Sequence, residues 1–539
     1  MSAAIFTNGT IRLDAWSDPV EAIVVDQGTV LKAGTLEEVE AAAGPAPRRI
    51  NLDGATVVPG LIESHVHPVF FGLTRNWTDC RSPLNGSIAD IQVALRQDLG
   101  TLADGKWLRG WGYDDTLLSD GRHPNREDLD AVSRDVPIVV SHISGHFVAA
   151  NSRALELAGI HRDRADPSDG KFVRDETGKL TGLMWEMGAV HTVLDAMPQA
   201  SAADVREAAV YALEVASERG MTSIHDLGVG IMAGDLEIET WRKLAAESSG
   251  LPIRVTGYVR SDLALRYLEK SPDLFSQPAI GRYRVAGAKF WSDGSIQGLS
   301  GALKEPYSCL DTECGELLYS PEELAGLLSR IDDAGGQCAV HANGDLAIST
   351  VAGAFATLRG SSEQKDPRHR VEHLQMASAK DIASLVASGS VASIFANHVY
   401  YWGDRHRDRF IGATRAARID PTRDAQDGGL HFGMHSDCPI TPMDALATFR
   451  TSVTRLTSGG SVLGEAQRLD PRAALHALTA DSAYLTHDEA HLGTLRAGLD
   501  ADITILDQDI VGLPIEQSQN VSAVATMVGG EFVFNRGGF

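Results

Sequence analysis

Two histidines one residue apart, His65 and His67, close an apolar stretch that reads VVPGLIESHVH. Alternate residues of a β-strand point to the same side, so both imidazoles can reach one point in space. Imidazole is the commonest nitrogen ligand of zinc and similar metals. By itself the pattern fits half of a metal site, and it also fits two polar residues in a loop. The rest of the chain has to decide between them.

Other residues capable of chemistry follow other apolar stretches. In chain order they are His142 and His146, His225 and Asp226, Lys289, His341, His373, Asn397 and His398, and Asp437. Each one alone is more often structural, as a hydrogen-bonded histidine, an ion-paired lysine or a turn aspartate. A His-X-His pair followed by Lys, His, His and Asp at successive strand ends is hard to obtain by chance. The combination indicates a metal centre whose first two ligands are His65 and His67.

The elements that would position these residues alternate along the chain. Apolar strand patterns are separated by amphipathic helical stretches such as DVREAAVYALEVASERG, which predicts an α/β fold with a (β/α)8 TIM-like barrel. In such a barrel the chemistry lies at the carboxyl ends of the strands. The eight expected strands are 57–67, 136–146, 221–228, 283–294, 336–345, 369–375, 390–398 and 430–437.

Both ends of the chain have short strands and turns, including the turn dipeptides Asn8-Gly9 and Asp53-Gly54. We therefore expect a small β-sandwich domain built from both termini. The interval after the first strand is too long for one crossover, and it predicts a helical insertion. The expected boundaries are 1–56 and 491–539 for the β domain, 57–490 for the barrel, and about 72–135 for the insertion.

Composition narrows the class of protein. A hydrophobic content of 43% indicates a soluble globular protein, and a net charge of −24 disfavours partners such as nucleic acid or an anionic membrane. No signal peptide or membrane-spanning run is visible, and five scattered cysteines argue against a disulfide framework. These features predict a cytoplasmic protein without nucleic-acid or membrane partners. Assembly as a homodimer is a hypothesis that the sequence leaves open.

The order of the candidate residues resembles the amidohydrolase superfamily of metal-dependent hydrolases. Finer matches resemble its family 3, which includes N-substituted formamide deformylase, and they extend over essentially the whole chain. The matching segments are VVPGLIESHVH, GWGYDDTLL, SGHFVAANSRALELAGI, AKFWSDGSIQG, VHANGDLAI, HRVEHLQ, HSDCPITPMDAL and LGTLRAGLDADITILD.

The resemblance implies a role for each matching residue. It implies one or two divalent ions, expected to be Zn²⁺, with His65, His67 and Asp437 on one metal. His341 and His373 would hold a second metal or complete a single-metal site. A carboxylated lysine at position 289 would bridge two metals, because a carbamate presents anionic oxygens where an ammonium would be repelled.

The expected reaction follows from the metal, which makes hydroxide available at neutral pH. Metal-bound hydroxide would attack the carbonyl of a small-molecule amide and cleave a linear C–N bond in an N-acyl or N-formyl group. Asp437 would transfer the proton, and His373 or the pair His142 and His146 would steady the oxyanion, with Lys289 completing the catalytic set. The alternatives are a cyclic amide or lactone hydrolase with the same centre, and a barrel scaffold without catalysis.

Aromatic residues in segments predicted to rim the barrel mouth suit an apolar or aryl substituent, although ordinary packing explains any one of them equally well. The predicted substrate-binding residues are Trp111, Tyr113, His142, His146, Trp291, Tyr400 and Trp402. We expect His435, His225 and Asp226 to be structural.

Overall fold

The computed structural model describes residues 3–82, 84–103, 105–167 and 170–539. The chain forms two compact units. One comprises the chain up to Phe70 together with Arg206–Phe539, and the other is Phe71–Val205.

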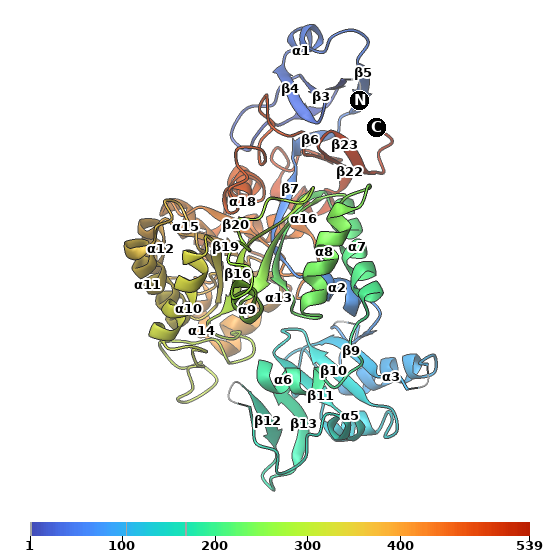
Figure 1. Ribbon diagram of the computed structural model, residues 1–539, viewed down its shortest axis with the longest axis vertical. Coiled ribbons are helices and arrows are strands. Elements are labelled where there is room, and N and C mark those ends of the chain that lie inside the picture. The colour runs from blue at the N-terminus through green and yellow to red at the C-terminus, as the bar shows by residue number, and fades with distance from the viewer. Residues whose placement is uncertain (1–2, 83, 104, 168–169) are drawn as a thin grey trace. The chain divides into compact units, whose positions relative to one another are not determined.

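The larger unit contains a sheet of eight parallel strands, which confirms the predicted barrel (Figure 1). The strands, in spatial order, are β7 (Leu61–Val66), β14 (Met221–Val229), β15 (Arg254–Arg260), β16 (Tyr283–Trp291), β17 (Gln337–Ala342), β18 (Arg370–His373), β19 (Val391–Ile394) and β20 (Phe432–Met434). Most of their residues are buried on both faces, as expected for parallel strands covered by helices.

The two edge strands, β7 and β20, nearly close the barrel. Their carboxyl ends are joined by a bond from Ser64 Oγ to Met434 O (3.0 Å) and by two backbone bonds, Asp437 N to His65 O (3.2 Å) and His67 N to Cys438 O (2.9 Å). The first and last strands thereby bring the His-X-His pair and Asp437 to one edge of the barrel.

Helices follow the strands around the barrel. They are α2 (Pro68–Thr74), α7 (Ala202–Glu218), α8 (Asp235–Ala246), α9 (Ser261–Leu268), α10 (Pro321–Asp333), α11 (Asp345–Ser361), α12 (Ala379–Ser388), α13 (His398–Arg405), the π-helix η1 (His406–Phe410), α14 (Gly412–Ala416), α15 (Thr422–Asp427), α16 (Ala445–Thr454), the short η2 (Glu465–Gln467), α17 (Pro471–Ala477) and α18 (Ala480–Tyr484). Helices α10, α11 and α12 pack side by side on the outside of the barrel (Figure 1).

One predicted barrel strand is wrong and one was missed. The segment 136–146 contributes β10 to a different sheet, and the third barrel strand is β15, which reads RVTGYVR. Strand β10 is as fully buried as a barrel strand and ends in a histidine, so its sequence imitates one. His225 consequently lies on the second barrel strand, while Lys289 keeps its place on the fourth.

The two ends of the chain form two further sheets. The first has the order β4 (Thr29–Gly34), β3 (Ala22–Asp26), β1 (Ala4–Thr7), β5 (Arg48–Asn51), with α1 (Leu36–Ala42) beside it. The second has the order β2 (Thr10–Ile11), β6 (Thr56–Pro59), β21 (Ile503–Leu506), β22 (Ala523–Val528), β23 (Glu531–Asn535), and η3 (Ile515–Asn520) precedes β22. Strand β21 pairs antiparallel with β6, so the two ends of the chain meet in one sheet.

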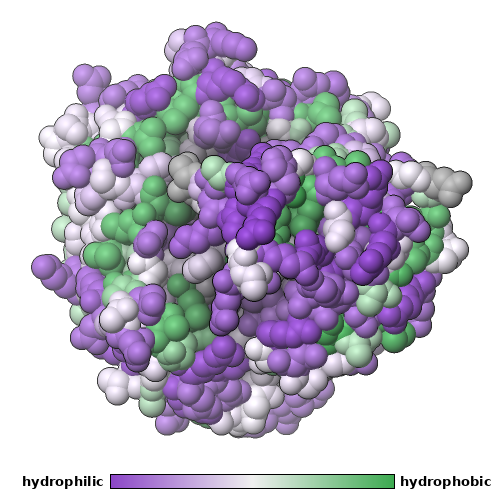
Figure 2. Space-filling view, turned by 90° about the horizontal axis from the view of Figure 1, so that it is seen from below, coloured by the Kyte–Doolittle hydropathy of each residue, from purple (hydrophilic) through white to green (hydrophobic). Residues whose placement is uncertain are grey.

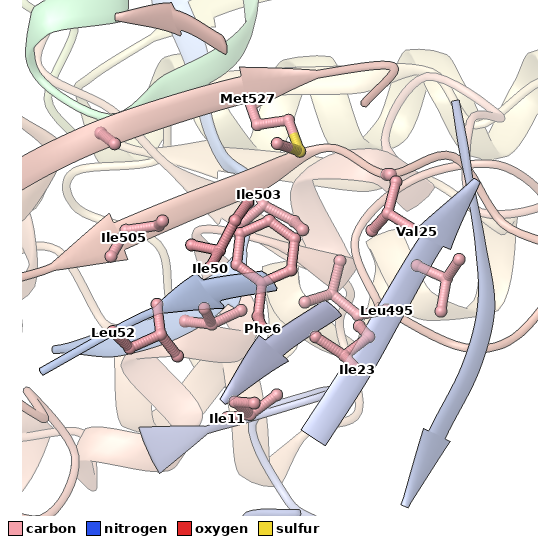
Figure 3. Close-up of a cluster of buried hydrophobic side chains, with 14 of the residues drawn as sticks. Phe6, Ile11, Ile23, Val25, Ile50, Leu52, Leu495, Ile503, Ile505 and Met527 are labelled. Atoms are coloured by element: carbon pink, nitrogen blue, oxygen red, sulfur yellow. The ribbon is translucent and has the colours of Figure 1, made fainter. Parts of the chain in front are cut away.

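A single apolar cluster joins these two sheets. Phe6 and Ile23, from the N-terminal segment, and Ile503 and Met527, from the C-terminal segment, are buried together (Figure 3). Burial of this kind is the main favourable term in folding. The N-terminal and C-terminal segments therefore depend on each other for a core.

The second unit, Phe71–Val205, differs from the predicted insertion of about 72–135 because it is longer and contains a sheet as well as helices. Its strands are β12 (Lys171–Arg174), β13 (Leu180–Trp185), β11 (Phe147–Ala150), β10 (Ile138–His142), β9 (Leu108–Tyr113) and β8 (Thr78–Asp79), in spatial order. Its helices are α3 (Ile88–Leu99), α4 (Arg126–Asp130), α5 (Ser152–Leu157) and α6 (Met187–Leu194). Two clusters of buried apolar side chains pack on the sheet, one that includes Val139 and one that includes Val140.

The face shown in Figure 2 is mainly hydrophilic, with hydrophobic side chains in separated areas. None of the helices within the described ranges has the length and apolarity that crossing a bilayer requires.

Replacing Phe6 tests the shared core. Phe6 is fully buried, so Phe6→Ala should lower the free energy of unfolding by about 3–5 kcal/mol. Leu31→Ala, on β4 in the same sheet, is the control, because Leu31 is 44% exposed and its loss should change stability by no more than about 0.5 kcal/mol. Denaturant unfolding measures both. Equal effects would show that Phe6 does not carry the core.

Candidate metal centre

The carboxyl ends of the barrel strands hold the residues that the sequence singled out. His65 lies on β7 and His67 directly follows it, while Lys289, His341 and His373 lie on β16, β17 and β18. Asp437 follows β20 by three residues. The structure thus brings these six residues to one end of the barrel. Their roles as ligands stay predictions.

The carboxylate of Asp437 lies close to both His65 and His67. Its Oδ1 lies 3.3 Å from His65 Nε2 and 3.2 Å from His67 Nε2. Among the described residues no hydrogen bond reaches this buried oxygen, and none reaches His67 Nδ1. Two imidazole nitrogens therefore face one carboxylate oxygen that accepts no hydrogen bond among the described residues, and this arrangement is suited to a cation.

A second group joins His65 to His373 and His435, whose nitrogens also lie close enough to hold one ion. The rings of His65 and His435 stack at 4.6 Å, and His373 Nδ1 lies 3.1 Å from His435 Nε2. We expected His435 to be structural, and the sequence had only its spacing from Asp437 to suggest more. Its contacts place it inside the cluster.

The three clustered histidines are neutral. Burial, reinforced by the charge of nearby Lys289, holds the pKa values of His65 and His435 well below the usual range of histidine. Burial and the neighbouring His341 do the same for the pKa of His373. Neutral imidazole is the form that binds metals.

Lys289 is buried beside this group. Its Nζ lies 3.3 Å from His65 Nε2 and 5.5 Å from the centre of the Trp291 ring. Burial lowers the pKa of Lys289 to about 8, so part of the population carries a neutral amine near pH 7 to 8. A neutral amine is a nucleophile, which an ammonium is not.

A buried ion pair fixes the orientation of His65. His65 Nδ1 lies 2.7 Å from Glu372 Oε2, and the same carboxylate accepts from Arg370 at 2.8 Å. A carboxylate has no proton to donate, so His65 Nδ1 is the donor. All three side chains are fully buried. The proton therefore sits on Nδ1, and Nε2 presents a lone pair that faces Asp437 Oδ1 and accepts from Lys289 Nζ. Sequence reasoning missed Glu372, although it lies next to His373 in the HRVEHLQ segment.

Two ligand candidates have unusual backbone conformations. His373 has φ of 71° and Asp437 has φ of 53°, in the left-handed region that non-glycine residues rarely adopt. Such conformations concentrate at functional sites, where the surrounding structure enforces them. Glu63 provides part of that enforcement, because its carboxylate accepts from Ser436 N (2.9 Å) and Ser436 Oγ (3.0 Å).

His341 lies against His373, with ring centroids 4.5 Å apart. Its Nε2 lies 3.0 Å from the carbonyl oxygen of Gly294, which can only accept a hydrogen bond, and 3.0 Å from Asn343 Nδ2. Nearby, the buried carboxylate of Asp293 accepts from three backbone N–H groups and fixes the loop after β16.

Four of the predicted substrate-binding residues belong to the second unit. Trp111, Tyr113 and His142 lie on β9 and β10, and His146 lies between β10 and β11. His142 Nε2 is 3.3 Å from Asp115 Oδ1, and His146 Nδ1 is 2.8 Å from Glu186 Oε2. The expected position of the two histidines at a barrel strand end is wrong, because β10 pairs within the other sheet. Their role in substrate binding stays a prediction.

The three predicted aromatic residues of the larger unit differ in exposure. Trp291 is half-buried at the end of β16, beside Lys289. Trp402 is buried against Phe395 and His398, and Tyr400 is 43% exposed. Of the three, Trp291 has the position that best suits contact with a substrate at the barrel end.

A parallel eight-stranded barrel with polar side chains gathered at the carboxyl ends of its strands is an architecture of barrel enzymes. The sequence profile of the amidohydrolase family matches residues 48–534, so the chain belongs to this family. The predicted resemblance is confirmed.

Similar proteins match over almost their full length. The Bacillus subtilis (strain 168) protein YtcJ is 29% identical over 96% of this chain and 97% of its own, and N-substituted formamide deformylase from Arthrobacter pascens is 26% identical over 100% and 99%. The crystal structure of an uncharacterized metal-dependent hydrolase from Pyrococcus horikoshii OT3 aligns with a TM-score of 0.77 at 24% identity, over 96% of this chain and 99% of that one. The structural likeness supports the fold.

Neutralising Glu372 tests the buried ion pair. Glu372→Gln should lower the free energy of unfolding by about 3–5 kcal/mol, because Arg370 would stay buried without a countercharge. The control is Glu489→Gln, which weakens another Arg–Glu pair, with Arg368, whose glutamate is 40% exposed. That change should cost no more than about 1 kcal/mol. Denaturant unfolding that gives similar small losses for both would contradict the assignment.

Proposed function

We propose that this protein is a divalent-metal-dependent amidohydrolase that cleaves a linear C–N bond in a small N-acyl or N-formyl amide. The observation that carries the proposal is Asp437 Oδ1, buried and without a hydrogen bond among the described residues, 3.2 and 3.3 Å from two imidazole nitrogens. Neutral imidazole and carboxylate are ligands that zinc prefers. The residues present fit such an ion.

Two sets of residues would hold metal. His65, His67 and Asp437 would form one site, and His341 and His373 would form a second or complete the first. When bound, a divalent ion supplies a lowered pKa for a coordinated water and polarises the substrate carbonyl. The ion proposed is Zn²⁺, because the donor set combines imidazole and carboxylate.

Asp437 would be the residue that moves a proton. Amide hydrolysis consumes one water: its oxygen bonds to the carbonyl carbon, the C–N bond breaks, and one water proton has to reach the leaving nitrogen. The Asp437 carboxylate can accept that proton at Oδ2, the oxygen that does not face the two ligand histidines, and deliver it to the nitrogen. The buried contacts of Glu63 with Ser436 hold the turn that carries this carboxylate.

The substrate class rests on two supports. One is the likeness to N-substituted formamide deformylase over the whole of this chain. The other is Trp291, an indole beside Lys289 that would suit an apolar or aryl substituent on the amide.

We also propose that Lys289 is carboxylated. Its neutral amine would attack carbon dioxide: the N–C bond forms as one C=O π bond opens, the nitrogen releases a proton to water, and the product is a carbamate whose one negative charge is shared by two oxygens. The burial of Lys289 supports this step, since an uncompensated ammonium is costly in a buried site that also holds a cation.

Elemental analysis tests the metal requirement. Protein purified without added metal should contain about one to two divalent ions per chain, and chelation should abolish hydrolysis of amides. His67→Ala and Asp437→Ala should lose metal and lower activity by more than the roughly 10- to 100-fold that outer-sphere partners cost. His161→Ala, at an exposed histidine, is the control and should keep both.

A panel of N-formyl amides, N-acyl amino acids, cyclic amides and lactones tests the substrate class. Turnover confined to the linear amides supports the proposal. Metal-free protein that hydrolyses members of the panel, or metal-loaded protein that hydrolyses only the ring compounds, would overturn it.

Carbon-13 NMR of protein grown with labelled bicarbonate tests the carbamate. A carbamate signal should be present in the native protein and absent from Lys289→Ala, which should also lose part of its metal. Lys243→Ala, at a lysine whose side chain is 71% exposed, should keep the signal. An unmodified Lys289 in fully metal-loaded, active protein would rule out the modification.

A further inference from the structure

A chain of buried hydrogen bonds leads away from His373. His373 Nδ1 lies 3.1 Å from His435 Nε2, and His435 Nδ1 lies 2.8 Å from Ser393 Oγ. Ser393 Oγ lies 2.7 Å from Ser64 Oγ, which in turn lies 3.0 Å from the carbonyl oxygen of Met434. All five residues are buried.

The carbonyl oxygen of Met434, at the end of this chain of hydrogen bonds, determines which atom donates in each bond. A carbonyl oxygen only accepts, so Ser64 must donate its one hydroxyl proton to Met434 O. Ser64 Oγ must then accept from Ser393, whose own single proton is thereby used. Ser393 Oγ in turn must accept from His435 Nδ1–H.

The direction extends to both imidazoles. A neutral His435 with its proton on Nδ1 has a bare Nε2, which accepts from His373 Nδ1–H. The Nε2 of His373 then carries no proton. In the opposite direction the bond to Met434 would be lost, and His373 would carry its proton on Nε2, where it would block a cation.

Packing holds the His435 ring in this orientation. The ring lies between the rings of His65 (4.6 Å) and Phe395 (5.0 Å), and it is inclined by 20° to each of them. A ring stacked on both faces inside the barrel cannot turn its nitrogens without displacing its neighbours.

We propose that His435, held by Ser393 and Ser64, is a positioning residue that keeps the proton of His373 on Nδ1 and presents His373 Nε2 as a bare nitrogen to the metal centre. The inference rests on the proposed function in that the bare nitrogen has a metal to bind. Outer partners of this kind fix the tautomer of a ligand histidine and commonly change metal affinity by roughly 10- to 100-fold.

The positioning role of His435 has two consequences, one for metal ligation and one for stabilisation of the oxyanion. Both nitrogens of His435 are used by His373 and Ser393, so His435 is not itself a ligand, although its nitrogens lie close to those of His65 and His373. A His373 with bare Nε2 can bind a cation, whereas it cannot donate a hydrogen bond to an oxyanion. The stabilising group for the oxyanion then has to be another residue or the metal.

Zinc titration against a competing chelator tests the proposal. The variants are Ser393→Ala, His435→Leu and His435→Gln, each checked for native circular dichroism and melting temperature. The control is Ser390→Ala, because Ser390 precedes the same strand, is also buried and makes a similar bond to Ser388 Oγ (2.8 Å) away from the site.

The expected order of zinc affinity among the variants follows from the chain of hydrogen bonds between His373 and Met434. Ser393→Ala should weaken binding about 10-fold and His435→Leu about 10- to 100-fold, while Ser390→Ala should match the native protein. His435→Gln should recover part of the loss, because its amide oxygen can accept from His373 Nδ1. Native affinity in both Ser393→Ala and His435→Leu would overturn the proposal. So would loss of a whole zinc equivalent in both His435 variants with Ser393→Ala unchanged, since that identifies a ligand.

A tautomer measurement separates this proposal from the proposed function. In metal-free protein with nitrogen-15-labelled histidine, the proton of His373 should be on Nδ1 and should become mixed in Ser393→Ala. If the native protein binds no zinc, the proposed function fails, and the tautomer alone then decides: a proton on Nε2 overturns the positioning role, and one on Nδ1 supports it.

Discussion

The hydrogen bond from His65 Nδ1 to Glu372 is the interaction on which the site depends. It decides which nitrogen of His65 is bare, and it can do so because Arg370 keeps the carboxylate an acceptor in a fully buried position. Burying an ion pair is costly, so its presence beneath the strand ends points to a use other than stability. That use is to aim one lone pair at Asp437 Oδ1.

The barrel supplies what this interaction needs. His65, Glu372 and Arg370 come from the first and sixth strands, far apart in sequence and facing each other across the interior. The remaining strands add His341 and Lys289, and the turn held by Glu63 adds Asp437. The proton of His65 is held on Nδ1 by Glu372, which leaves the lone pair of Nε2 facing Asp437 Oδ1 and Lys289 Nζ. Such a buried arrangement is costly to leave without a cation.

Much of this could be predicted from the sequence, and the failures have physical causes. The strands that carry His65, Lys289 and His373 each have a histidine or lysine at or near the carboxyl end, where barrel enzymes hold their chemistry. Strand β15, RVTGYVR, contains no histidine, lysine or carboxylate and begins and ends with arginine, so its sequence does not mark it as a strand of the site. Strand β10 has the same local pattern as a barrel strand, and only its pairing partners in space distinguish it.

The partners of the site residues were less accessible. Glu372 and His435 act through contacts with residues 307 and 62 positions away, respectively, and no local spacing indicates such contacts. Continued alternation from β20 would put His435 and Asp437 on one face, but the strand ends at Met434 and Asp437 adopts a left-handed conformation. Side-chain direction beyond a strand end cannot be taken from its period.

Anomalous diffraction from crystals of the protein grown with Zn²⁺ tests the central claim most directly. We expect a zinc peak within bonding distance, about 2.0–2.2 Å, of His65 Nε2, His67 Nε2 and an Asp437 oxygen, with His65 Nδ1 still bonded to Glu372. A fully loaded crystal with no peak there, or with zinc bound through His65 Nδ1 and the Glu372 contact broken, would contradict it.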